Sequence, residues 1–171
     1  MFQKKHIHFI GIGGIGMSGI AQVLHKKGFK VSGSDLSENI IIKKLKKKMK
    51  IFSSHEAENV NNADIVVYSS AIQKNNIELL TAQKQKIPVF SRAMMLAQVM
   101  RLKSSITVAG SHGKTTTTSL IASIFETSGM DPTILSGGII NNLEINAKLG
   151  KGDWIIAEAD ESDGSFMYLP S

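Results

Sequence analysis

One short stretch, Ala-Gly-Ser-His-Gly-Lys-Thr-Thr at residues 109–116, combines the residue types that bind nucleotide phosphates. A phosphate loop uses glycines to bring backbone N–H groups close to the anion, and the N-terminus of the following helix adds partial positive charge. A lysine supplies a full charge to the terminal phosphates, and the next hydroxyl binds magnesium. Here Gly110 and Gly113 would be the flexible positions, Lys114 would supply the positive charge and Thr115 would bind magnesium.

The stretch departs from the strict pattern GxxxxGK[ST], which requires glycine where this chain has Val108. Four consecutive threonines follow Lys114, and because threonine is a poor helix former, helix propensity alone would not select them there. The alternative is a glycine-lysine turn before a threonine-rich helix, with no ligand. We predict a nucleotide site made of Gly110, Ser111, His112, Gly113, Lys114, Thr115 and Thr116.

A magnesium-nucleotide site also needs a carboxylate at the end of a neighbouring strand. Glu158 is the first acid beyond the apolar part of the expected strand at 153–157. Because Mg²⁺ prefers oxygen ligands, Thr115 and Glu158 are the predicted metal ligands. The alternative is an acidic turn that caps a following helix, a role open to Asp160 and Asp163.

A second glycine-rich loop, Gly-Ile-Gly-Gly-Ile-Gly at residues 11–16, fits the GxGxxG fingerprint between an expected strand and an expected helix. Asp35 ends the next expected strand about twenty residues on, as the fingerprint requires. The pattern predicts a nucleotide that carries a diphosphate. An NAD-binding oxidoreductase is one alternative, although a dehydrogenase has no use for the lysine-threonine loop.

Expected strands and helices alternate along the chain, which predicts an α/β fold with a Rossmann-like, doubly wound parallel sheet. The expected strands lie at 6–11, 29–35, 51–52, 63–70, 87–90, 105–109, 134–135 and 153–157, and the expected helices at 15–27, 38–49, 75–85, 92–101 and 114–128. The pattern breaks near Lys103 and then restarts. We therefore expect a first domain at 1–103 and, at 104–171, the incomplete start of a P-loop ATPase-type α/β domain.

Composition and charge limit the remaining function classes. The chain has no cysteine, which excludes disulfides and thiolate metal sites and favours a cytoplasmic protein. No apolar run is long enough for membrane insertion. The net charge of +6 comes from a local lysine run at 43–50, in which Ile42, Leu45 and Met49 recur at helical spacing. No aromatic side chains interleave with these lysines, so we expect a solvated helix face and no nucleic-acid partner.

Taken together, GIGGIGMSGIA, SGSD, SSAI, AGSHGKTTTTS and AEADESDGSF resemble, in order and spacing, the motifs of the Mur ligases. The resemblance implies that the first loop binds the diphosphate of a UDP-sugar and that the second binds ATP through a shortened Walker motif, which accounts for Val108. The implied diphosphate contacts are Gly13, Gly14, Ile15, Gly16, Met17 and Ser18, with Asp35, Ser69 and Ser70 near the uridine.

The resemblance also implies the chemistry, an ATP-driven formation of an amide bond in peptidoglycan precursor synthesis. The substrates would be UDP-N-acetylmuramate and L-alanine, with ATP and Mg²⁺, and an acyl phosphate would be the intermediate. Lys114, Thr115 and Glu158 would carry the catalysis by positioning and electrostatics. Because family members continue well past residue 171, we expect this chain alone to bind a UDP-sugar, to bind ATP weakly and not to ligate. A non-catalytic UDP-sugar-binding remnant is a further alternative.

Overall fold

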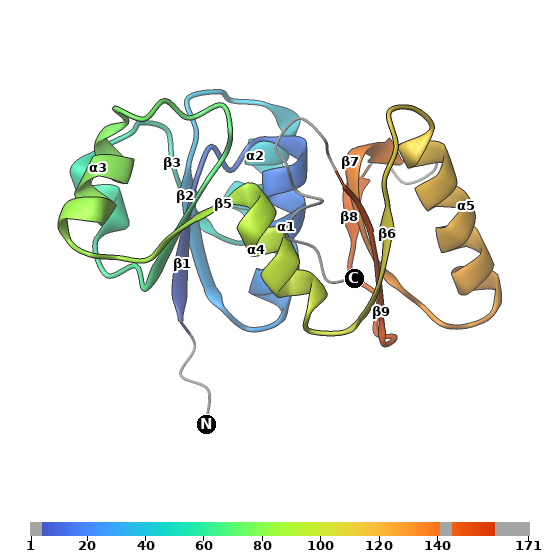
Figure 1. Cartoon of the computed structure of the whole chain (residues 1–171). Coiled ribbons are helices and arrows are strands. Elements are labelled where there is room, and N and C mark those ends of the chain that lie inside the picture. The colour runs from blue at the N-terminus through green and yellow to red at the C-terminus, as the bar shows by residue number, and fades with distance from the viewer. Residues whose placement is uncertain (1–4, 141–144, 160–171) are drawn as a thin grey trace. The chain divides into compact units, whose positions relative to one another are not determined.

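The computed structural model describes residues 5–140 and 145–159, and the chain divides into two compact units, Met1–Arg92 and Ala93–Ser171 (Figure 1). The division falls at the start of helix α4 (Arg92–Met100), and the boundary expected near Lys103 falls just after the end of this helix. In the part of the chain that is described, no helix is long and apolar enough to cross a bilayer.

The first unit contains a parallel five-stranded sheet in the order β3-β2-β1-β4-β5. Its strands are β1 (His6–Ile10), β2 (Lys30–Ser34), β3 (Lys50–Phe52), β4 (Ile65–Tyr68) and β5 (Val89–Ser91). Its helices are α1 (Ile15–Lys26), α2 (Ile40–Lys46), the 3-10 helix η1 (Ala57–Val60) and α3 (Ile77–Lys84). In Figure 1, α3 lies on one side of this sheet and α1 and α2 lie on the other. The prediction of a doubly wound parallel sheet is therefore confirmed.

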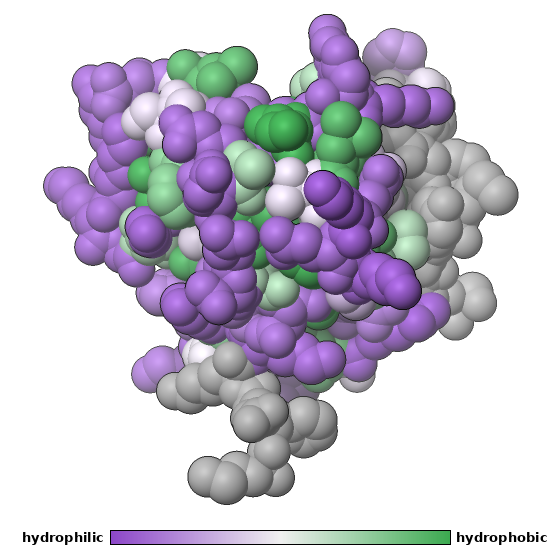
Figure 2. All heavy atoms as spheres, turned by 90° about the vertical axis from the view of Figure 1, so that its left-hand side faces the viewer, coloured by the Kyte–Doolittle hydropathy of each residue, from purple (hydrophilic) through white to green (hydrophobic). Residues whose placement is uncertain are grey.

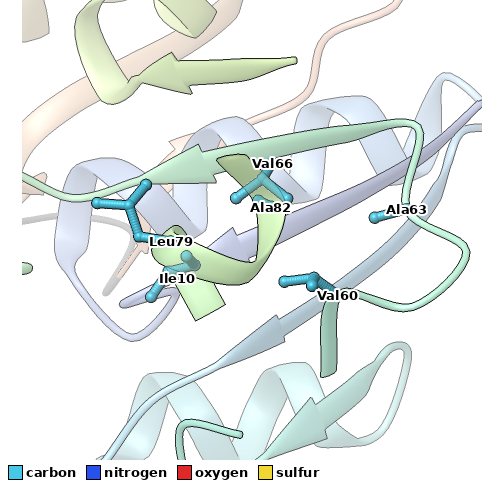
Figure 3. Packing of buried hydrophobic residues seen from close by; sticks show 6 residues of the cluster. All are labelled: Ile10, Val60, Ala63, Val66, Leu79 and Ala82. Carbon is cyan, nitrogen blue, oxygen red and sulfur yellow. The ribbon is translucent and has the colours of Figure 1, made fainter. Parts of the chain in front are cut away.

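A hydrophobic cluster joins α3 and η1 to the strands β1 and β4 (Figure 3). Its buried members are Ile10, Val60, Ala63, Val66, Leu79 and Ala82. Figure 2, which looks at the side of the molecule that carries α3, shows hydrophobic patches separated by hydrophilic side chains. On α3, Ile77 and Leu80 are each 46% exposed while Leu79 is 5% exposed, so only one face of this helix is part of the core.

Asparagine caps set the starts of two helices in the first unit. The Asn76 side chain accepts from the amides of Glu78 and Leu79 at 3.0 and 3.3 Å, which starts α3 where the sequence predicts. The Asn39 side chain accepts from the amide of Ile42 at 2.9 Å, so α2 begins at residue 40 and is shorter than the expected helix at 38–49.

The lysine-rich segment at 42–50 has the buried apolar face that the sequence predicts, although its helix is shorter than expected. Ile42, Leu45 and Met49 are buried at 2%, 2% and 7% exposure. The six lysines between residues 43 and 50 are exposed. The helical spacing of the apolar residues was therefore interpreted correctly.

The second unit contains a four-stranded sheet in the order β6-β9-β7-β8, with helix α5 packed against β7 and β9. Its elements are β6 (Ser104–Val108), α5 (Lys114–Thr127), β7 (Thr133–Ile140), β8 (Ile145–Lys148) and β9 (Trp154–Glu158). Ala122, Ile134 and Ile156 form its core cluster. The strand β8, antiparallel to β7, was not predicted. The expected strand at 134–135 is also longer in the structure, because β7 runs on through Gly137 and Gly138, residues that weaken a strand signal.

Candidate functional site

A cleft of about 380 Å³ lies at the carboxyl ends of the strands of the first unit. Its lining residues are Gly11, Gly13, Gly14, Asp35, Leu36, Ser37, Asn39, His55, Ser69, Ala71 and Ile72. They come from the segments that follow β1, β2, β3 and β4. The chain adds β2 and β3 on one side of β1, and β4 and β5 on the other. The cleft is therefore at the switch point of the strand order, where open α/β sheets bind ligands.

The glycine loop after β1 is fixed to β2 by its own backbone. Gly11 has φ +79°, which lets the chain turn out of the strand without the steric cost of a side chain. The amides of Gly11 and Ile12 then both donate to the carbonyl of Ser34, at 2.8 and 3.1 Å. A Cβ atom at Gly13 would lie 2.8 Å from a carboxylate oxygen of Asp35, so this position has no room for a side chain.

Asp35 lines the cleft and binds the glycine loop directly. One of its carboxylate oxygens accepts from the Gly13 amide at 2.7 Å, and the other accepts from the Ser37 amide at 2.9 Å. The Asn39 side chain donates to the Gly13 carbonyl at 3.2 Å, so both backbone groups of Gly13 are held by side chains. A sequence pattern assigns Asp35 to a ligand, whereas the structure shows that it also sets the position of the loop.

The amides at the start of α1 are the groups of this loop that are placed to meet an anion. The first hydrogen bond within the helix runs from the Ser18 amide to the Gly14 carbonyl at 2.9 Å, so the amides of Gly16 and Met17 precede it and have no intrahelical partner. Helix N-termini of this kind bind phosphate through such amides and through the helix dipole.

The other residues predicted for the UDP-sugar differ in how far their side chains reach the cleft. Met17 and Ser18 are buried at 1% and 0% exposure, so their side chains are part of the fold. Ile15 is half-buried at the start of α1. Ser69 lines the cleft, whereas Ser70 is exposed and is not among the lining residues.

Several lining residues were not predicted, of which His55 and Ser37 carry the most chemistry. His55 follows β3, whose carboxyl end meets those of β1 and β2 at the same edge of a parallel sheet. Ser37 lies two residues after Asp35, and its hydroxyl donates to that carboxylate at 2.5 Å. Both positions could have been found by asking which polar side chains come after each expected strand.

A buried polar network lies beside the cleft and is centred on Glu78, in the first turn of α3. Glu78 is 0% exposed and accepts from the Ser34 hydroxyl and the Asn59 amide group, each at 2.6 Å. His55 Nδ1 lies 3.1 Å from the same Glu78 oxygen that Ser34 binds. His8 Nε2 lies 3.7 Å from the other oxygen, beyond hydrogen-bond reach.

The network keeps the Glu78 carboxyl ionised. Burial raises the pKa of this carboxyl, but the interactions with His8, Ser34 and Asn59 lower it by more, and the net pKa lies below its usual value. A buried carboxylate with several donors is stable as an anion, because the donors replace the water that it loses.

The second glycine loop, between β6 and α5, faces solvent. Ser111, His112, Gly113 and Thr116 are exposed, and a Cβ atom at Gly113 would meet nothing within 4 Å. Gly113 has φ +75° and precedes the first residue of α5, Lys114, whose Nζ donates to the carbonyl of Gly110 at 2.5 Å. The predicted phosphate-binding residues therefore form an open turn at a helix N-terminus, with the lysine bound to the turn itself.

The strand pairing of the second unit brings Glu158 beside this loop. Glu158 ends β9 and is the register partner of Val108, which ends β6 immediately before the loop. The Glu158 side chain is buried and accepts from the Ser136 hydroxyl at 2.7 Å. Glu158 therefore ends the strand beside the one that leads into the loop of Thr115. Because carboxylate and hydroxyl oxygens suit Mg²⁺, these two residues stay the predicted metal ligands. Asp160 and Asp163 lie outside the described residues.

The fold and the cleft define a Rossmann-like α/β protein, joined to a second α/β unit that carries an open glycine-lysine-threonine loop. The model of the Mur ligase family, catalytic domain, matches residues 6–104, more than half of the chain. The chain therefore belongs to the Mur ligase family.

The chain is similar to known members of this family along nearly its whole length. It is 56% identical over 166 residues to the UDP-N-acetylmuramate--L-alanine ligase of Bradyrhizobium sp. (strain BTAi1 / ATCC BAA-1182), with 96% of this chain and 36% of that protein covered. It is 34% identical to the crystal structure of UDP-N-acetylmuramate-alanine ligase from Thermotoga maritima, with a TM-score of 0.84 over 92% of this chain and 37% of that one.

A ligase of different specificity is about equally close in fold. This is UDP-N-acetylmuramate:L-alanyl-gamma-D-glutamyl-meso-diaminopimelate ligase from Neisseria meningitides, 29% identical with a TM-score of 0.85, with 94% of this chain and 54% of that one covered. Fold alone therefore does not separate the two specificities. The chain spans about a third of the length of the curated relatives it matches.

Proposed function

We propose that this chain carries the UDP-sugar cleft and the ATP loop of an ATP-dependent ligase that joins L-alanine to UDP-N-acetylmuramate. The support is the cleft at the switch point of the first sheet, together with 56% identity to a ligase with this name. The product belongs to peptidoglycan precursor synthesis, and we place the protein in the cytoplasm.

In this proposal the cleft binds the UDP part of the substrate. The diphosphate lies at the N-terminus of α1, with Gly14 and Ile15 beside it and the amides of Gly16 and Met17 donating to it. The other two predicted contacts are not made by amides, because the Gly13 amide is bound to Asp35 and the Ser18 amide to the Gly14 carbonyl. The uridine lies toward Asp35 and Ser69, and Ser70 is near the rim. The physical support is that the amides at the start of α1 are held in place before a ligand arrives, because Asp35 and Ser34 fix the loop.

The second loop, Gly110–Thr116, binds the triphosphate of ATP in the same proposal. Lys114 leaves the Gly110 carbonyl and stabilises the charge on the transferring phosphoryl group. Thr115 and Glu158 hold Mg²⁺, which neutralises phosphate charge when bound. The muramate carboxylate attacks the γ-phosphate to give an acyl phosphate and ADP, and the amine of L-alanine then displaces phosphate to form the amide.

Thermal unfolding with three ligands tests this proposal, because a ligand that binds only the folded chain raises the melting temperature. We expect UDP-N-acetylmuramate to raise it, and Mg-ATP to raise it less and only while Lys114 is present. Stabilisation by NADH that survives Lys114→Ala, with no response to UDP-N-acetylmuramate, would favour the oxidoreductase alternative. Alanine-dependent ADP release by these 171 residues would contradict our expectation that they do not ligate alone.

A further inference from the structure

The buried carboxylate of Glu78 is close enough to His55 to decide where that imidazole carries its proton. Glu78 Oε2 lies 2.6 Å from the Ser34 hydroxyl oxygen, and an ionised carboxylate can only accept. The single hydroxyl proton of Ser34 must therefore point at Glu78. His55 Nδ1 is 3.1 Å from both of these oxygens, so both are acceptors toward it. Nδ1 must then be the ring nitrogen that carries the proton.

The protonation of Nδ1 fixes the character of the other ring nitrogen. In a neutral imidazole one nitrogen donates and the other accepts, so Nε2 of His55 is left with a lone pair. His55 lines the cleft, and its side chain is 14% exposed. The neutral form of His55 therefore presents a hydrogen-bond acceptor to the cleft, near the groups that follow β2 and β3.

We propose that Glu78 is a positioning residue that holds His55 in the Nδ1–H tautomer, so that Nε2 accepts a hydrogen bond from a neutral N–H or O–H group of the bound nucleotide. The inference rests on the proposed nucleotide cleft. Such an acceptor favours a hydroxyl or an imide N–H, and it disfavours an anionic group at the same point. Glu78 itself is buried and acts only through His55.

The substitution Glu78→Gln should change the tautomer of His55. The Asn59 amide donates to Oε1 at 2.6 Å, which requires the glutamine oxygen at that position and places its NH₂ group where Oε2 was. This NH₂ group donates toward Ser34 and His55, so the carboxylate acceptor for Nδ1–H is lost and an N–H donor faces Nδ1. We therefore expect Nδ1 to accept and the ring to change to the Nε2–H tautomer, which presents a donor to the cleft.

Long-range ¹H–¹⁵N spectra of the histidine rings, together with titration of UDP into the full chain, test the proposal. We expect the unchanged chain to show His55 as the Nδ1–H tautomer. In Glu78→Gln we expect the Nε2–H tautomer and UDP binding about tenfold weaker, the effect of one net hydrogen bond. Glu58→Gln, at an exposed position on η1, is the matched control and should change neither. An Nε2–H signal in the unchanged chain, or unchanged tautomer and affinity in Glu78→Gln, would overturn the proposal.

A second set of titrations decides the matter if Glu78→Gln does not fold. We expect the loss of one donor, in 2′-deoxy-UDP, 3′-deoxy-UDP or 3-methyl-UDP, to weaken binding about tenfold in the unchanged chain and not in His55→Ala. No such difference for any analogue would overturn the proposal. Absence of UDP binding to the unchanged chain would contradict the proposed function itself. Normal UDP binding with the wrong tautomer would contradict only the role of Glu78.

Discussion

The two loops of this chain are both glycine-rich and both join a strand to a helix, but their physical settings are opposite. The loop at 11–16 is part of a packed unit: its amides bind Ser34 and Asp35, and Gly13 has no space for a side chain. The loop at 109–116 is exposed, Gly113 has empty space around it, and Lys114 is bound to the loop's own carbonyl.

The loop at 11–16 is therefore preorganised for a ligand, whereas the loop at 109–116 must rearrange to bind one. Amides that are fixed before binding lose little conformational entropy when the ligand arrives, and this favours affinity. A lysine that is bound to its own loop must first leave that contact to reach a phosphate. We therefore expect the first loop to be sensitive to changes in packing and the second to be sensitive to changes in charge.

The largest expected effect comes from the polar network beside the first loop. Glu78→Ala removes the acceptor for Ser34 and Asn59 and leaves three buried polar side chains without the carboxylate that they face, so we expect the free energy of unfolding to fall by about 3–5 kcal/mol. Urea unfolding followed by far-UV circular dichroism measures it. Glu58→Ala, an exposed control on η1, should change the free energy by less than about 0.5 kcal/mol. A similar, small effect in both variants would show that the network is not structural.

A pair of glycine substitutions sharpens the comparison between the loops. Gly13→Ala forces Cβ to 2.8 Å from Asp35, and we expect a loss of about 1–3 kcal/mol from overpacking. Gly113→Ala meets no atom, and its cost of about 1–2 kcal/mol comes only from the left-handed backbone at φ +75°. Gly14→Ala is the control for the first loop, because its Cβ would be 3.6 Å from the nearest atom. Equal losses of stability at Gly13 and Gly14 would contradict the packing argument.

The sequence was sufficient to predict the elements around both loops, for a physical reason. Strands such as β4 and β9 are mostly apolar runs, and α3 has an asparagine cap, so each is encoded locally. The contact between Asp35 and the Gly13 amide was not predictable, because the fingerprint identifies both residues without saying which atoms meet. The network of Glu78 and His55 was missed because its members come from separate elements that only the strand order brings together.

The smallest expected effect is the dependence of stability on pH. Burial lowers the pKa of His6 below its ordinary value of 6.5, a shift to which Lys30 and His8 add, while hydrogen bonding to the Asn62 carbonyl and the charge of Asp64 oppose it. As pH falls below 6.5, the unfolded chain takes up a proton that the folded chain does not, so the free energy of unfolding falls. The lowered pKa of Glu78 acts in the same direction below about pH 4.5.

Urea midpoints measured from about pH 7.5 to about pH 5.5 should therefore decrease, and His6→Gln should flatten that decrease. The same variant should keep the loss of stability at more acidic pH, to which Glu78 contributes. A midpoint that rises on acidification through this range would mean that His6 is charged in the folded chain.

The most direct test of the two-loop account is to follow the backbone amide ¹H–¹⁵N signals of the chain as UDP-N-acetylmuramate is added. We predict that the signals that move belong to Gly14, Gly16 and Asp35 and to their neighbours along the cleft, while those of Gly110 and Gly113 stay in place. Movement confined to the residues around Lys114, or no movement at all, would contradict the assignment of the first loop to the sugar nucleotide.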